Sequence, residues 1–395
     1  MKKIIGVIIV FIVVIFIYTF NILNKNMFKY SNTNDKVIGN FTAKTSSEIL
    51  TNDKNNICYS PVSAISALIL SSQFVEDDAI TEICEVFDVN DVKELSELYG
   101  YIQKQVKVSE KTELKLCNSL WIDKDIVKTD SNELIDNCRK KLNCEIFENE
   151  DVLGSDINSW ILRKTNGLIE GVADKNEEYP LFLANALYYR SNWEKNFANV
   201  GNDDFYLDDG KKIQTPYIKC SKQTMRYMET DQYTMVKVGL EDGDLCLVLP
   251  NDNKKLTDML TEDKLNEFMA LSSNDKMDRG VVTISIPEFT YEYESGSMLE
   301  TVVKKVGINK VFNSDYWILG DETEADNVRI GQKSKIVLNK DGIEAATSTM
   351  VEVAYIGKSK DKEVDLEITF DRPFLYILMK DGVPLFIGTV YNPAE

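Results

Sequence analysis

An apolar stretch without a charged residue runs from Ile4 to Leu23, between Lys2–Lys3 and Lys25. It is long enough to span a bilayer as a helix, and longer than the roughly 7–15 apolar residues of a signal-peptide core. The positive-inside rule places Lys2 and Lys3 in the cytoplasm and the rest of the chain outside.

This pattern predicts a signal anchor, or alternatively a cleaved signal peptide, over residues 1–23. Residues 24–37 are rich in Asn, Lys, Ser and Thr and are predicted to be a polar tether. We therefore expect an extracellular or cell-surface protein, either anchored in the membrane through residues 4–23 or secreted.

Helical patterns come first in the remainder of the chain. Ser60 followed by Pro61 is a good helix start, and Val62, Ile65 and Ile69 then follow at helical spacing. A second helix is predicted to begin at Asp156, with an apolar face that includes Trp160 and Ile161.

Strand patterns dominate the second half. The nearly continuous apolar run from Leu181 to Tyr189 is typical of a strand that is buried on both faces. Further strands are predicted at Leu245–Leu249, Val281–Ile286, Lys335–Leu338, Phe374–Met379 and Val383–Val390. Residues 38–395 contain no repeat or linker that would mark a second boundary, so we expect one domain of mixed α and β structure with large sheets.

Composition excludes several classes of function. The chain has 395 residues, a formal net charge of −19 and no histidine. Without histidine there is no Ser-His-Asp or Cys-His mechanism and no His-containing zinc site. The negative charge argues against nucleic acid as a partner, and seven scattered cysteines without a C-x-x-C pair are expected to be buried free thiols. Phosphate-loop and nucleophile-elbow motifs are also missing, so we expect no enzyme, no cofactor and no metal ion.

Eight segments together resemble the serpin family, the serine-protease-inhibitor fold. In chain order they are NICYSPVSAISALIL within 55–70, INSWILRKTNGLI (157–169), NALYYRSNWEKNF (185–197), IPEF (286–289), VGINKVF (306–312), NKDGIEAATST (339–349), FDRPFLYILM (370–379) and PLFIGTVYNP (384–393). The resemblance implies an α+β serpin fold with a large mixed central sheet, further sheets, eight or nine helices and an exposed reactive-centre loop. The short MKK start suggests a prokaryotic member.

The resemblance also implies a monomeric inhibitor that acts as a suicide substrate. A serine protease cuts the exposed loop and forms an acyl complex, and the loop then inserts into the central sheet. The alternative is a non-inhibitory serpin that acts as a binding or carrier protein at the cell surface.

The expected loop has the alternation that insertion requires. The hinge comprises Gly342, Ile343, Glu344, Ala345, Ala346, Thr347, Ser348 and Thr349. Every second residue from Ile343 to Val353 is uncharged, so insertion would bury that set and leave Glu344 and Glu352 in solvent. Ile343 stands where many inhibitory members have threonine, which leaves the carrier alternative open.

Two further groups of residues are transferred by the resemblance. At the upper opening of the sheet, Trp193 matches the family tryptophan, and Glu288 and Lys340 exchange the family's charges, so we predict that they form its ion pair in reversed sense. Lower in the sheet, the polar cluster where strands part would contain Ser60, Ser63, Asn185 and Gln332. Gln332 replaces a common histidine and does not titrate, so inhibition should lack a histidine's pH sensitivity.

The family's spacing places the reactive bond at Ile356–Gly357. The segment before Phe370 is longer than is common, so Tyr355 and Lys358 remain alternatives. Ile356 would suit an elastase-like protease, Tyr355 a chymotrypsin- or subtilisin-like one, and Lys358 a trypsin-like one. We favour the elastase-, subtilisin- and chymotrypsin-like classes.

Overall fold

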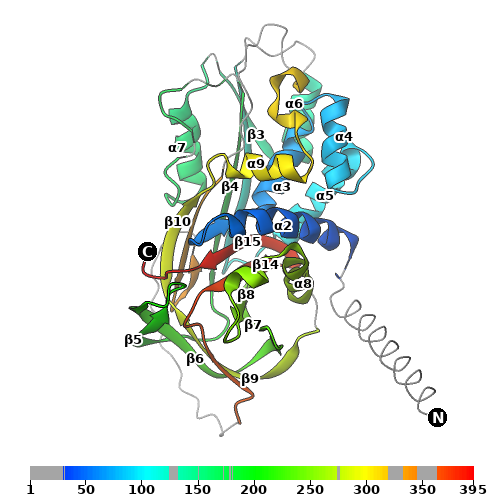
Figure 1. Ribbon diagram of the computed structural model, residues 1–395. Coiled ribbons are helices and arrows are strands. Elements are labelled where there is room, and N and C mark those ends of the chain that lie inside the picture. The colour runs from blue at the N-terminus through cyan, green and yellow to red at the C-terminus, as the bar shows by residue number, and fades with distance from the viewer. Residues whose placement is uncertain are drawn as a thin grey trace, which may run out of the picture.

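The computed structural model describes most of the chain. The described residues are 30, 32–123, 132–149, 151–171, 173–177, 179, 181–273, 276–318, 332–344 and 363–395. They form two β-sheets and eight α-helices, so the predicted α+β class is confirmed (Figure 1).

The six-stranded sheet is mixed. Its strand order is β10-β11-β12-β4-β2-β3, and β2 and β3 are parallel while the other pairs are antiparallel. The bounds are β2 (Glu113–Asp123), β3 (Cys144–Asn149), β4 (Leu181–Asn192), β10 (Phe289–Glu294), β11 (Lys333–Asn339) and β12 (Gly342–Glu344).

The nine-stranded sheet has the order β1-β15-β14-β8-β7-β6-β9-β13, with β5 paired to β6. Its strands are β1 (Ile57–Tyr59), β5 (Ala198–Tyr206), β6 (Lys212–Glu229), β7 (Tyr233–Leu240), β8 (Gly243–Pro250), β9 (Asp278–Pro287), β13 (Leu366–Thr369), β14 (Phe374–Lys380) and β15 (Val383–Val390). The six strands predicted from the sequence are thus confirmed as β4, β8, β9, β11, β14 and β15.

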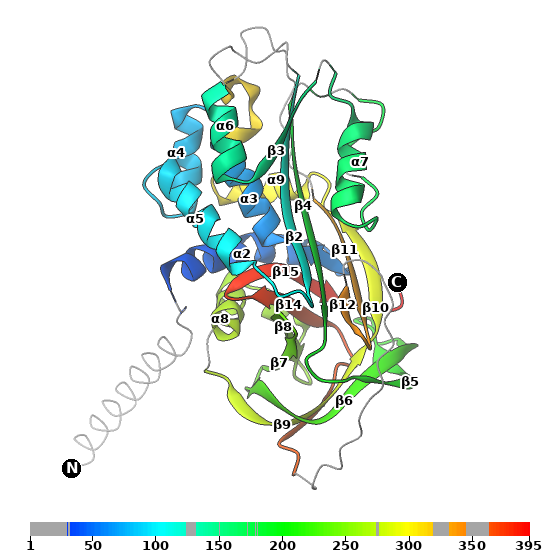
Figure 2. The same ribbon diagram turned by 180° about the vertical axis from the view of Figure 1, so that it is seen from behind.

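Helices cover both faces of the six-stranded sheet. Figures 1 and 2 show α7 on one side and α3 to α6 on the other. The bounds are α2 (Thr33–Asn52), α3 (Pro61–Ser71), α4 (Asp77–Val86), α5 (Val92–Gln105), α6 (Asn132–Lys141), α7 (Gly154–Lys164), α8 (Glu262–Ser272) and α9 (Met298–Val306). The predicted start of α3 is confirmed, because Ser60 caps it by accepting a hydrogen bond from the Ser63 N–H.

Strand β4 lies between two hydrophobic clusters, as its apolar sequence predicts. Leu187 and Tyr189 belong to the main core, whereas Ala184 and Ala186 pack with Trp160 of α7 in a second, smaller core. The strand is therefore buried on both faces, and α7 covers one of them.

The beginning of the domain differs from the prediction. Asn32 caps α2, which starts at Thr33, so residues 33–37 are helical and not part of a tether. Tyr30 already packs on Gly39, and its hydroxyl donates to Asn266 Oδ1 of α8 at 3.0 Å. None of the helices in the described ranges is both long and apolar enough to cross a bilayer, and the apolar stretch 4–23 lies outside these ranges.

Candidate functional site

The predicted hinge begins inside the six-stranded sheet. β12 pairs on one side with β11, where Leu338 faces Ile343, and on the other side with β4, where Ser191 faces Ile343 (Figure 2). The Ile343 side chain is 1% exposed and belongs to the main core. The first three residues of the hinge thus form a short strand that is paired between two longer ones.

Gly342 is required by close packing at this point. A Cβ atom there would lie 2.2 Å from the carbonyl oxygen of Ser191 and 2.8 Å from the Cα of Asn192. Any larger residue would push β12 away from β4, because such contacts are far below van der Waals separation.

Trp193 connects the end of β4 to the turn before β12. Its indole N–H donates to the carbonyl of Asn339 at 2.8 Å, and its backbone N–H donates to the carbonyl of Asp341 at 3.4 Å. The ring packs against Phe197, with centroids 4.7 Å apart, and is nearly buried. Trp193, which the resemblance places at the upper opening of the sheet, thus lies beside the turn that leads into the hinge.

Glu288 and Lys340 are neighbours but not an ion pair. The Glu288 carboxylate accepts a hydrogen bond of 3.1 Å from the backbone N–H of Lys340, whereas the Lys340 ammonium pairs with Asp341 at 2.6 Å. The predicted reversed ion pair is wrong, because a carboxylate next to the turn reaches a backbone donor and leaves the flexible lysine to the adjacent aspartate. Glu288, directly before β10, is still hydrogen-bonded to the turn that leads into the hinge.

Ser60, Ser63 and Gln332 form the expected polar cluster below the hinge. The Gln332 side chain accepts from the Ser60 N–H at 2.7 Å and donates to the Ser60 carbonyl at 3.0 Å. The Ser60 hydroxyl donates to that of Ser63 at 3.0 Å. Gln332, directly before β11, is thereby linked to the start of α3 through both the oxygen and the NH₂ group of its amide.

Asn185 is the exception in this cluster. Its amide donates to Asn118 Oδ1 at 2.6 Å, and Asn118 in turn donates to the hydroxyl of Tyr99. The resemblance places Asn185 in the same cluster, and in the structure its amide points along the β4–β2 pair toward Asn118, which is its register partner. Its Oδ1 is buried and has no hydrogen-bond partner among the described residues, and burial raises the pKa of Tyr99.

The cysteines do not form a reactive site. All seven are free thiols, and six of them are buried. Burial raises the pKa of Cys58 to about 12 and those of Cys220 and Cys246 to about 11, so these thiols stay protonated at neutral pH. Over the described ranges, no group of three carboxylates or thiols could hold a metal ion.

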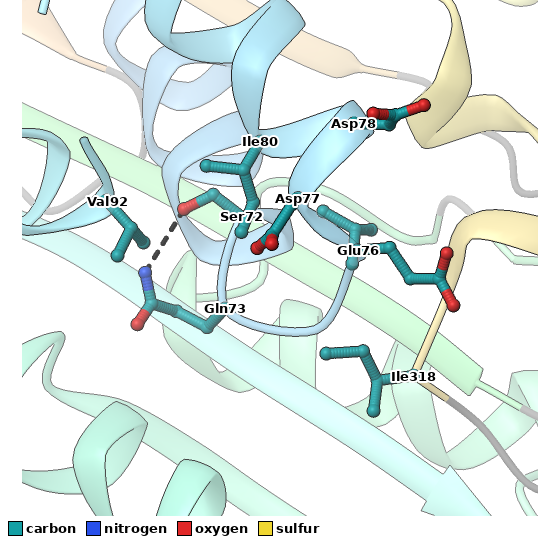
Figure 3. A pocket seen from close by; sticks show the side chains of 9 residues that line it. Ser72, Gln73, Glu76, Asp77, Asp78, Ile80, Val92 and Ile318 are labelled. Atoms are coloured by element: carbon teal, nitrogen blue, oxygen red, sulfur yellow. Dashed lines mark hydrogen bonds between the residues drawn. The ribbon is translucent and has the colours of Figure 1, made fainter. Parts of the chain in front are cut away.

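A pocket of about 570 Å³ lies apart from the hinge, between the end of α3 and the starts of α4 and α5 (Figure 3). Its rim carries the carboxylates of Glu76, Asp77 and Asp78, and Ile318 lines its wall. The two aspartates occupy the first turn of α4, where the helix dipole favours negative charge. The acidic rim is thus explained by the helix start.

The rest of the predicted site lies outside the described residues. This applies to Ala345, Ala346, Thr347, Ser348 and Thr349 of the hinge and to the bond Ile356–Gly357 with its alternatives Tyr355 and Lys358. We call residues 345–362 the reactive segment. Its two ends are described: Glu344 ends β12, and Glu363 leads into β13.

Comparisons with known proteins agree with this architecture. The model of the family described as Serpin (serine protease inhibitor) matches residues 36–393. An alpha-1-antitrypsin-like protein, GS55-MS of Ictidomys tridecemlineatus, is 26% identical over 370 residues, which cover 88% of this chain and 86% of the relative.

Two solved structures share the fold. Serpin48, described as a highly specific serpin in the insect Tenebrio molitor, matches with a TM-score of 0.75 and 21% identity over 92% of this chain and 98% of that one. Human thyroxine-binding globulin complexed with its hormone matches with a TM-score of 0.74 and 19% identity over 92% of this chain and 100% of that one.

Proposed function

Because this chain belongs to the serpin family, we propose that it inhibits serine proteases as a suicide substrate. A protease cleaves the reactive segment and becomes attached to it as an acyl enzyme. The segment then enters the six-stranded sheet as an additional strand and traps the protease before the acyl bond is hydrolysed. The chain needs no catalytic residue of its own for this, since the nucleophile belongs to the protease.

The observation that supports this proposal most strongly is the position of β12. Its three residues already pair with β11 and β4, and Ile343 is buried between them. Strand addition needs a position where an incoming strand can pair on both sides. β12 is paired in this way, and we expect the residues that follow to insert in the same register.

The register predicts how insertion would continue. Glu344 faces Arg190 of β4 and Val337 of β11, so the next residues would follow β4 toward Tyr189. The small residues from Ala345 to Thr349 would enter without overpacking the core. This continuation uses the uncharged set of the alternation for the buried face.

We place the reactive bond at Ile356–Gly357, with Tyr355 and Lys358 as alternatives. An aliphatic residue before the cleaved bond suits an elastase-like pocket, whereas Tyr355 suits subtilisin- or chymotrypsin-like enzymes. The protein acts at the cell surface or outside the cell, anchored through residues 4–23 or secreted. Its prokaryotic origin stays a prediction.

The test is to mix the full-length chain with elastase-, subtilisin-, chymotrypsin- and trypsin-like serine proteases. Denaturing gels should reveal a complex that resists SDS, and mass spectrometry of the released C-terminal peptide should locate the cleaved bond. Cleavage without a complex, and without a rise in the melting temperature of the cleaved chain, would contradict the proposal.

A non-inhibitory carrier is the second candidate, and Ile343 is the observation that favours it. Ile343 stands where many inhibitory members have threonine. The fold is also compatible with carriage, because thyroxine-binding globulin shares it. Cleavage that gives neither a complex nor a gain in stability would support this function.

A further inference from the structure

Asn185 of β4 has a buried side-chain oxygen without a hydrogen-bond partner. Its amide nitrogen donates to Asn118 Oδ1 on β2 at 2.6 Å, whereas Asn185 Oδ1 is buried and accepts no hydrogen bond from the described residues. An unsatisfied buried acceptor costs free energy, and buried polar groups of native proteins are normally paired. The missing donor at Asn185 Oδ1 therefore needs an explanation.

The orientation of the Asn185 amide shows where a donor could approach. β4 lies between β2 and β12 in the six-stranded sheet (Figure 2). The amide nitrogen is directed toward Asn118, the register partner of Asn185 on β2. Because the amide group is planar, its oxygen is directed away from that hydrogen bond. The most direct approach for a donor is thus from the side of β4 on which β12 pairs.

This side of β4 has a described partner strand over only three residues. β12 pairs with β4 from Asn192 to Arg190, whereas β2 pairs with the other edge of β4 over residues 181–190. Among the described residues, no strand pairs with the β12 side of β4 over residues 181–189. Because the reactive segment follows β12 directly in the sequence, a continuation of β12 would place part of this segment beside Asn185.

The register of β12 identifies the residue that would face Asn185. β12 and β4 are antiparallel, and Glu344 faces Arg190. Each further residue of an inserted strand would therefore face the preceding residue of β4. Without a bulge, this continuation places Thr349 opposite Asn185. The Cβ atoms of directly facing residues in an antiparallel pair are roughly 4.5–5.5 Å apart, which is close enough for their polar atoms to form a hydrogen bond.

The side chain at position 349 would be on the buried face of the sheet. Ile343 belongs to the main core, which also contains Leu187 and Tyr189 of β4. Side chains of a strand alternate between its two faces, so Asn185 is on the same face as Leu187 and Tyr189, and an inserted Thr349 would be on the same face as Ile343. The threonine hydroxyl would then be an O–H donor next to the unpaired Asn185 Oδ1.

We propose that Asn185 is a positioning residue for the inserted state, and that its Oδ1 accepts a hydrogen bond from the Thr349 hydroxyl when the cleaved reactive segment enters the sheet. This inference rests on the proposed function, because only insertion brings Thr349 to β4. The bond satisfies an acceptor that is unpaired before cleavage, so it favours insertion. It also favours one register, since a shift by one residue would move the Thr349 side chain to the opposite face.

The experiment uses the full-length chain and changes the hydroxyl at position 349. Thr349→Val removes the hydroxyl and keeps the shape of the side chain, whereas Thr349→Ser keeps the hydroxyl. Thr290→Val is the matched control, because Thr290 is exposed on β10 of the same sheet. For each protein, the serine protease panel is used to measure the rate of cleavage and the stoichiometry of the SDS-resistant complex. Guanidinium unfolding then gives the midpoints of the intact and the cleaved chain.

We expect Thr349→Val to be cleaved at the wild-type rate and the midpoint of its intact chain to be unchanged, because the bond forms only after cleavage. Its stoichiometry of inhibition should rise about threefold and the midpoint of its cleaved chain should fall, since the loss of a neutral hydrogen bond slows the step that forms it and weakens the state that contains it. Thr349→Ser should retain most of the inhibition, and Thr290→Val should match the wild type. In an Asn185→Ala background, Thr349→Val should have no further effect.

Equal stoichiometry and equal midpoints for Thr349→Val and the wild type would overturn the bond and leave the inhibitory function standing. The same loss with and without Asn185 would also overturn it. If the cleaved wild-type chain gains stability but traps no protease, the inhibitory function fails, and a lower midpoint of the cleaved Thr349→Val chain then still supports the bond. If cleavage brings no gain in stability, or no protease of the panel cleaves the chain, both proposals are overturned.

Discussion

Ile343 shows how one residue links sequence, packing and proposed function. It is a β-branched residue in a strand, where such side chains pack well, and it is 1% exposed between Leu338 and Ser191. The sequence alternation places it on the inward face. Its burial is therefore the residue-scale evidence that the hinge can enter the sheet.

Under the proposed function, Ile343→Arg should make the chain a substrate that is cleaved without trapping the protease. An unpaired guanidinium at this buried position would have to lose its hydration, which costs several kcal/mol, so β12 would leave the sheet and insertion would be slow. We expect the stoichiometry of inhibition to rise severalfold while the rate of cleavage stays near the wild-type value. The control is Asp341→Arg, at an exposed turn position two residues earlier. Unchanged stoichiometry for Ile343→Arg would contradict this role.

At the scale of elements, the carboxylate of Glu145 on edge strand β3 connects the six-stranded sheet to α7. Glu145 of β3 accepts hydrogen bonds from the Trp160 indole, at 3.0 Å, and from the Lys164 ammonium. Lys164 also lies 5.6 Å from the centre of the Trp160 ring. The opposite face of α7 is open, with Leu162 partly exposed, so Glu145 helps to hold the helix over β4.

The stability contributed by Glu145 should depend on pH. Burial by itself would raise the pKa of this carboxyl, but the hydrogen bonds from Lys164 and Trp160 and the charge of Lys164 hold it below its usual value. A carboxyl whose pKa is lower in the folded state stabilises the fold above its unfolded pKa of about 4.3, and this contribution is lost as pH falls through the folded pKa.

Glu145→Gln should therefore lower the free energy of unfolding by roughly 0.5–1 kcal/mol at pH 7, a modest value because the Glu145 side chain is 46% exposed. The difference from wild type should shrink as the pH is lowered from about 5 to 3. Urea unfolding at several pH values measures it. Glu148→Gln is the control, since Glu148 is on the same strand but pairs with Arg139 of α6 at 3.1 Å. A difference that is the same at pH 7 and pH 3 would refute the assignment.

At the scale of the whole molecule, the contacts of the folded domain begin at Tyr30 among the described residues. Tyr30 packs on Gly39 of α2 and bonds to Asn266 of α8. The sequence between the apolar stretch and this point comprises only residues 24–29. If residues 4–23 form an anchor, the domain is held close to the membrane surface, because six residues extend to at most about 20 Å.

The predicted anchor is tested by fractionation. The full-length chain should sediment with membranes and resist carbonate extraction, because about 20 apolar residues insert stably. Deletion of residues 1–23 should release the protein into the soluble fraction with an unchanged melting temperature, since Tyr30 and its contacts are retained. If the expressed full-length chain is instead recovered only in the soluble fraction, with a mass that lacks residues 1–23, the segment is a cleaved signal peptide.

Local patterns in the sequence determined much of this protein. Apolar runs predicted six strands, Ser60 followed by Pro61 predicted the start of α3, and the eight family segments predicted the fold. Once the resemblance had identified the hinge, alternation predicted that Ile343 would be on the buried face if the hinge entered the sheet. These features depend on which face of an element a side chain occupies, and that is set by spacing along the chain.

The tertiary structure decided which partner each polar group has. Glu288 bonds to a backbone N–H and not to the Lys340 ammonium, Asn185 bonds to Asn118, and Thr33 already belongs to α2. The exposure of Val200 on β5 likewise depends on a bulge in the pairing of β5 with β6. Hydrogen bonds act over about 3 Å, so these outcomes depend on where distant segments place their atoms, which side-chain spacing along the chain does not specify.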